Sequence, residues 1–246
     1  LAERAKAANG GTTPNDMNVW YTVAAQYLGN NKPESAQLFI DEIYKTLKEG
    51  KSATTSEGQQ LTLAANPSIA EPSQGALQAL GITQDKRESA GPTERAECPR
   101  TITCRFIPAG YAANSSDPAA YGNYDHSNRP KDMRVKYIVI HNTEGSYTSA
   151  ISHFQDTTSY VSAHYVIRSS DGDVTQMVDT KDTAWHAGDW YVNMHSIGIE
   201  HEGVAAQGGK WYTEAMYRSS ANLVKYLAKK YDIPLDRAHI IGHDNV

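Results

Sequence analysis

The stretch KYIVIHNT (136–143) decides the fold of the second half of the chain. Its apolar run from Tyr137 to Ile140 contains two β-branched residues and predicts a strand buried on both faces. His141 ends that strand, and polar residues follow it. Because open α/β sheets place ligands at the carboxyl ends of their strands, we expect a functional site at His141.

Two later stretches are expected to bring side chains to the same place. SIGIEHEG (196–203) alternates, so Gly198 and Glu200 point to the face opposite that of the two isoleucines. Gly198 has no side chain to crowd a substrate beside Glu200. HIIGHDN (239–245) repeats the first pattern, since a short apolar strand leads to His243. Two strand-end histidines and a carboxylate could therefore converge.

Metal-assisted hydrolysis uses such a set of side chains. Neutral imidazoles bind zinc well, a catalytic zinc keeps one position for water, and the pKa of that water falls to about 7. A carboxylate that does not bind the metal can then take the proton. The alternative for each histidine is a satisfied core or surface residue, and the residues alone leave both interpretations open.

These three stretches, with VSAHYVI (161–167) and AWHAG (184–188), resemble the zinc-dependent N-acetylmuramoyl-L-alanine amidases, a family shared with phage lysozyme-type amidases and peptidoglycan recognition proteins. The match covers about residues 134–246. It implies a peptidoglycan hydrolase with a zinc cofactor. The enzyme would cleave the amide between N-acetylmuramic acid and the L-alanine of the stem peptide, in peptidoglycan or muropeptides. It also implies an α/β fold in which a central mixed β-sheet is flanked by helices.

The matching motifs imply a role for several residues. His141 and His243 correspond to the first two zinc ligands of the family, and Glu200 to the catalytic acid or base of its muropeptide-recycling branch. The AWHAG motif resembles a loop lining the peptide groove. The substrate-binding residues implied in this way are Asn142, Arg168, Trp185 and His186.

The sequence departs from the family pattern in two places. Ala163 stands where other branches have a catalytic tyrosine, so Tyr165 should not inherit that role. The third zinc ligand, an aspartate or cysteine, would lie beyond Val246, and Asp244 should point elsewhere on an extended backbone. We therefore expect a truncated sequence with an incomplete metal site. A non-catalytic module that binds peptidoglycan is the alternative function.

Composition bounds the remaining possibilities. The 246 residues are 39% hydrophobic and 21% charged, as in ordinary soluble proteins. A net charge of −5 without a long basic run argues against nucleic acid as a partner. No apolar run reaches the ~18 residues of a membrane helix. The chain opens at Leu1 without a leader, so we expect a signal peptide to be absent or removed. A monomer is expected.

The two cysteines, Cys98 and Cys104, are either a disulfide or a pair of free thiols. A disulfide would indicate a compartment outside the reducing cytosol. We therefore expect a secreted or cell-wall-associated protein.

The chain ahead of these cysteines is expected to be simpler. Apolar residues at helical spacing predict helices over 16–28 and 33–49, which form a helical hairpin within residues 1–50. Residues 51–97 are predicted to be linker-like, with one short strand and one short helix. The catalytic domain is predicted to comprise residues 98–246.

Overall fold

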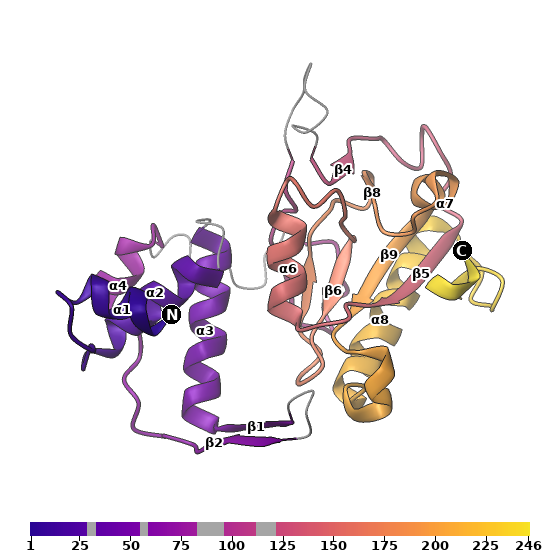
Figure 1. Ribbon diagram of the computed structural model, residues 1–246. Coiled ribbons are helices and arrows are strands. Elements are labelled where there is room, and N and C mark those ends of the chain that lie inside the picture. Colours follow the sequence, from indigo (N-terminus) through magenta and orange to yellow (C-terminus); the bar gives the residue numbers. More distant parts are fainter. Residues whose placement is uncertain (29–32, 55–58, 83–95, 112–121) are drawn as a thin grey trace. The chain divides into compact units, whose positions relative to one another are not determined.

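The computed structural model describes residues 1–28, 33–54, 59–82, 96–111 and 122–246 (Figure 1). The chain divides into two compact units, residues 1–90 and 91–246. Within the described ranges, no helix is both long and apolar enough to cross a membrane.

The first unit is built from helices, as the sequence predicts. Its elements are α1 (Ala2–Ala8), α2 (Met17–Leu28), α3 (Pro33–Glu49), the antiparallel pair β1 (Lys51–Thr54) and β2 (Gln60–Leu63), and α4 (Gln74–Ala79). Tyr21 of α2, Ile40 of α3 and Leu77 of α4 are fully buried together. The predicted linker therefore contains a hairpin and a helix that belongs to this core, while its residues 83–95 lie outside the described ranges.

The second unit is organised around a mixed six-stranded sheet, which confirms the predicted α/β fold (Figure 1). The strand order is β10-β5-β9-β6-β7-β3. Only the β6–β7 pair is antiparallel, and the other four pairs are parallel. The strands are β3 (Cys104–Phe106), β5 (Tyr137–Asn142), β6 (Tyr165–Ile167), β7 (Val174–Gln176), β9 (Ser196–His201) and β10 (Ile240–Gly242).

Helix α8 (Glu214–Tyr231) covers one face of this sheet. Thr213 caps its first turn by accepting a hydrogen bond from the Met216 amide, at 3.2 Å. The buried stripe of α8 packs against alternate residues of the central strands, because side chains two apart in a strand share a face. This core contains Ile138, Tyr165, Ile167, Ile197, Ile199, Met216, Leu223, Leu227 and Tyr231.

The other face of the sheet carries shorter elements. Helix α6 (Tyr147–Gln155) lies against it, and the Tyr147 hydroxyl bonds the Thr175 hydroxyl of β7. Helix α7 (Trp190–His195) precedes β9, and the two-stranded pair β4 (Tyr124–Asp125) and β8 (Thr183–Ala184) lies beside it. The 3-10 helices η2 (Ala205–Lys210) and η3 (His243–Asn245) follow β9 and β10.

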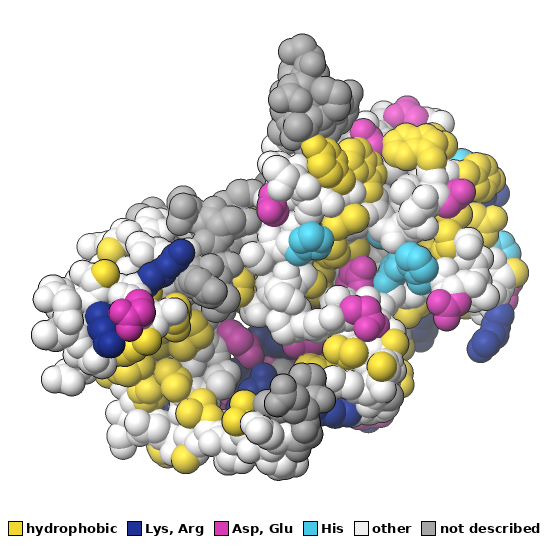
Figure 2. Space-filling view, in the orientation of Figure 1, with side chains coloured by type: hydrophobic (Ala, Val, Ile, Leu, Met, Phe, Trp, Pro, Cys, Tyr) yellow, Lys and Arg dark blue, Asp and Glu magenta, His cyan; other side chains and the backbone are white. Residues whose placement is uncertain are grey.

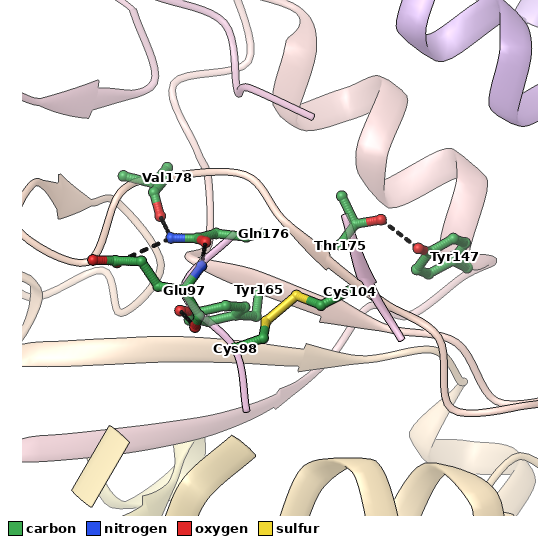
Figure 3. The surroundings of a disulfide bond; sticks show 8 residues. All are labelled: Glu97, Cys98, Cys104, Tyr147, Tyr165, Thr175, Gln176 and Val178. Carbon is green, nitrogen blue, oxygen red and sulfur yellow. Dashed lines mark hydrogen bonds between the residues drawn. A yellow bond between two sulfur atoms is a disulfide. The ribbon is translucent and has the colours of Figure 1, made fainter. Parts of the chain in front are cut away.

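A disulfide joins Cys98 to Cys104, at the start of β3 (Figure 3). Beside it, the Tyr165 hydroxyl donates to the Glu97 carbonyl at 2.7 Å, and the Glu97 amide donates to Gln176 Oε1 at 2.6 Å. These hydrogen bonds attach the segment before β3 to β6 and β7.

Candidate active site

The register of β5 and β9 places His141 directly beside Glu200. Both side chains lie on the face of the sheet that α8 leaves free, since their neighbours Ile140 and Ile199 point toward α8. His141 is 5% exposed and Glu200 is 8% exposed. The alternation read from the sequence therefore brings the predicted histidine and carboxylate to one place.

The second predicted histidine arrives from the edge of the sheet. Gly242 ends β10 opposite Ile140, and η3 begins at His243. The Nδ1 atoms of His243 and His141 are 2.8 Å apart, with the two rings nearly perpendicular. Residues more than a hundred positions apart in the chain thus share one contact.

His186 is the third imidazole of this cluster. Its Nδ1 lies 3.0 Å from Nε2 of His141, on the side of that ring away from His243. The Asn193 side chain of α7 fixes the backbone here, because its Oδ1 accepts from the amides of His186 and Ala187, at 3.0 and 2.9 Å.

The His186 ring occupies the space above Gly198. A Cβ on Gly198 would lie 2.5 Å from Cγ of His186. The sequence predicts that the missing side chain leaves room for a substrate, but the structure fills that room with an imidazole. This is a correction to the prediction, and the cause is the close approach of the AWHAG loop to β9.

His141 and His186 are held in their neutral form. Burial, and next the nearby His243 and His201, lower the pKa of His141 to about 3. Burial also lowers the pKa of His186 well below its usual value, with His141 as the next cause. Neutral imidazoles have a free ring nitrogen, which is the form that binds metals.

Glu200 has the opposite shift. Burial, and next the repulsion of Glu144, raise the pKa of its carboxyl to about 7. Its Oε2 atom is buried and has no hydrogen-bond partner among the described residues. A carboxyl whose pKa lies near neutrality can both accept and release a proton, which is the requirement for a general acid–base group.

These groups border an open pocket of about 670 Å³. Figure 2 shows histidine and acidic side chains close to hydrophobic ones on the visible face of the second unit. The lining combines aromatic rings with a few polar groups, as in sites that bind sugars and peptides. It consists of Phe154, Tyr160, Val161, Ser162, Trp185, His186, Gly188, Trp190, Asn193, Glu200 and His243.

The four predicted substrate-binding residues divide between two locations. Trp185 and His186 line the pocket, and the Trp185 indole donates to Asp125 Oδ2 at 2.6 Å. Asn142 instead accepts a hydrogen bond from the Tyr212 hydroxyl at 2.9 Å. Arg168 forms ion pairs at 2.7 Å with both Asp171 and Asp173 in the β6–β7 turn. The structure thus places Asn142 and Arg168 apart from the pocket lining.

Sequence reasoning missed several residues of the site. Trp190, Tyr160 and Phe154 line the pocket, and Asn193 orients the loop that carries His186. Trp190 and Asn193 lie close behind AWHAG in sequence, with Asp189 as the N-cap of α7, so a helix-start signal was present. Phe154 and Tyr160 have no local signal, because the tertiary fold alone brings them to the pocket.

The histidine cluster offers nitrogen donors that suit a metal ion. One ring nitrogen of His141 and one of His243 face each other at 2.8 Å, and zinc–nitrogen bonds of about 2.0–2.1 Å would let one ion reach both. Among the described residues, no three His, Cys, Asp or Glu side chains are grouped as a metal site. The donors present therefore fit two positions of a zinc site.

Comparison with known proteins finds similarity over the second half of the chain. Residues 131–246 match the protein-family model described as N-acetylmuramoyl-L-alanine amidase. N-acetylmuramoyl-L-alanine amidase A of Achromobacter lyticus is 42% identical over 114 residues, which are 46% of this chain and 60% of that protein. N-acetylmuramoyl-L-alanine amidase CwlA of Bacillus subtilis (strain 168) is 37% identical over 76 residues, which are 29% of this chain and 27% of that protein.

A solved structure is also similar. The crystal structure of a selenomethionine AmpD derivative shares 28% identity with a TM-score of 0.41, over 58% of this chain and 82% of that chain. This chain spans 60% and 27% of the lengths of the two amidases that it matches in sequence.

Proposed function

We propose that this chain, whose residues 131–246 match the family model described as N-acetylmuramoyl-L-alanine amidase, belongs to that family and is a peptidoglycan hydrolase. Its reaction is hydrolysis of the amide between N-acetylmuramic acid and the L-alanine of the stem peptide. The observation that carries the proposal is the convergence of His141, His243 and Glu200 beside one pocket. His141 and Glu200 are buried and His243 is exposed, and the pKa shifts of His141 and Glu200 suit this reaction.

His141 and His243 would hold the zinc ion that the family resemblance implies, as two of the three protein ligands of a catalytic site. When bound, zinc supplies a Lewis acid that lowers the pKa of water and polarises a carbonyl oxygen. His141, which is held neutral, contributes a nitrogen donor that need not lose a proton before binding.

Glu200 is the proposed general base and then general acid. Its unpartnered Oε2 takes a proton from the attacking water as the water oxygen bonds to the amide carbon. The same carboxyl then gives this proton to the amine of L-alanine as the carbon–nitrogen bond breaks. A pKa of about 7 suits both steps, because the carboxyl releases the proton as readily as it takes it.

Trp185 and the neighbouring aromatic residues are the proposed substrate contacts. The indole of Trp185 is fixed by Asp125, so its ring can pack against a sugar or peptide without losing further freedom. Asn142 and Arg168 are not included, since their polar groups are already bonded within the fold.

Action at the cell wall follows from the proposed substrate. Secretion is part of the proposal as well, and the Cys98–Cys104 disulfide supports it, because such bonds persist in oxidising compartments. A peptidoglycan-binding module without activity is the second candidate. The aromatic lining of the pocket, which includes Trp185 and Trp190, would serve such a module equally well.

One experiment separates the two candidates. The purified chain is incubated with insoluble peptidoglycan, with and without a zinc chelator, and newly exposed amino termini are labelled and identified. New alanine termini that disappear with chelator are the result expected of the amidase. Sedimentation with the wall and no new alanine would establish the binding module and remove the catalytic role of Glu200.

A further inference from the structure

We infer that His186 and Ser196 are positioning residues that hold His141 with its Nδ1 atom unprotonated and directed toward His243. The inference rests on the proposed function, in which His141 is a zinc ligand. It gives His186, the histidine of AWHAG, a role other than substrate binding. It stands on a chain of hydrogen bonds that runs from the α7 backbone to the His141 ring.

The chain of bonds starts at Ser196, the first residue of β9, which is fully buried. Its Oγ lies 2.6 Å from the Val192 carbonyl oxygen and 3.1 Å from Nε2 of His186. A carbonyl oxygen only accepts, so the single hydroxyl proton of Ser196 is donated to Val192. The Ser196 oxygen must then accept, and the proton in the second contact belongs to Nε2 of His186.

The direction of the remaining bonds follows. A neutral imidazole carries one proton, so Nδ1 of His186 is bare and accepts across the 3.0 Å contact from Nε2 of His141. His141 in turn has a bare Nδ1. That nitrogen faces Nδ1 of His243 at 2.8 Å, so His243 donates there in the metal-free chain.

The surrounding structure holds the His186 ring, which lies in the middle of this chain of bonds. The Asn193 side chain holds the amides of His186 and Ala187, and Gly198 lets the His186 ring lie against β9. Groups that bond the far nitrogen of a metal-binding histidine set its tautomer and orientation, and their loss typically lowers metal affinity about 10–100-fold. His186 and Ser196 occupy that position relative to His141.

The first test reads the protons directly in the metal-free chain. Long-range ¹H–¹⁵N correlation spectra of ¹⁵N-histidine-labelled protein distinguish protonated from bare ring nitrogens. We expect His141 and His186 to carry their protons on Nε2, and His243 to carry one on Nδ1. A proton on Nδ1 of His141 would overturn the inference.

The second test measures zinc affinity by chelator competition. His186→Leu is expected to lower the affinity about 10–100-fold, whereas His186→Asn should retain more of it, because its Oδ1 can accept in place of Nδ1. His153→Leu, at an exposed histidine of α6, is the matched control and should change nothing. Equal affinities for His186→Leu and His153→Leu would contradict the proposed positioning.

Ser196→Ala keeps the test decisive if His186→Leu fails to fold. It removes the acceptor of the His186 proton, so both the histidine spectrum and the affinity should change, and an unchanged spectrum with unchanged affinity would overturn the inference. Failure of the proposed function is distinguishable. If the wild-type protein carries its ring protons on the expected nitrogens but binds no zinc, the zinc mechanism is refuted while the hydrogen-bonding role of His186 and Ser196 is retained.

Discussion

Gly198→Ala tests whether the packing of His186 on β9 builds the site. A Cβ at this position would lie 2.5 Å from Cγ, 2.6 Å from Cδ2 and 2.8 Å from Nδ1 of His186. Ordinary contacts begin at 3.4 Å, so the ring must move by about 0.9 Å, or β9 must shift. The imidazole cannot move that far and keep its contacts of 3.0 Å to His141 and 3.1 Å to Ser196.

The expected magnitude has two parts. Overpacking in a closed interior costs about 1–3 kcal/mol of unfolding free energy. For a unit of this size, that corresponds to a fall of roughly 2–12 °C in Tm. Displacing a group by about 1 Å can lower catalysis about 100-fold. We therefore expect Gly198→Ala to lose activity even at temperatures where it is fully folded.

The assay combines thermal unfolding with release of alanine termini from peptidoglycan at 25 °C. Gly209→Ala is the matched control, because a Cβ there meets nothing within 4 Å, and its stability should change by less than about 0.5 kcal/mol. A Gly198→Ala protein with the Tm and activity of wild type would show that the His186 ring is not confined as the structure describes.

Three further predictions follow from the same structure. Glu200→Gln should lower peptidoglycan hydrolysis about 10²–10⁴-fold, while the protein still sediments with the wall, because it removes the proton acceptor and keeps the shape of the side chain. The pKa of Glu200 is raised from 4.5 to about 7, so the folded state binds more protons than the unfolded state between these values and stability falls as pH rises. The unfolding free energy of the metal-free protein, measured with urea, should therefore fall by about 3 kcal/mol between pH 4.5 and 7. Glu200→Gln should not show this fall. Equal pH profiles for both proteins would contradict the burial of a titrating carboxyl. The Cys98–Cys104 bond closes a loop with a sequence separation of 6, so its reduction should cost about 2 kcal/mol of unfolding free energy in the loop-entropy model. Thermal unfolding should then show a lower Tm with reductant than without it. A Tm independent of reductant would refute this prediction.

The sequence predicts those parts of the site that depend on a strand pattern. The buried run before His141 and the alternation around Glu200 determine which side chains point away from α8, and pairing of β5 with β9 makes these two neighbours. The period of two along a strand is a local property, so it can be read without knowing the fold.

The sequence does not predict the contacts that loop residues make with the sheet. A glycine at position 198 could leave space for a substrate, or it could let another side chain pack closely against the strand. Only the position of the His186 ring in the structure decides between these interpretations. Arg168 has the same ambiguity, because its charge suits a substrate carboxylate as well as Asp171 and Asp173. Local partners are the usual outcome for a buried arginine, since an unpaired buried charge is costly.

The edge position of β10 has a consequence for the stability of the site. In the described part of the chain, β10 pairs only with β5 and its three residues are half-buried, whereas β5 and β9 each have neighbours on both sides. Short edge strands open at lower free energy than central ones, so His243 is carried by a more weakly held element than its partner His141. Any ligand that bridges the two histidines binds only the closed arrangement and must draw β10 onto the sheet by linkage. Amide hydrogen exchange in β10 would then report occupancy of the site, while the amides of β5 and β9 would stay protected whether or not a ligand is bound.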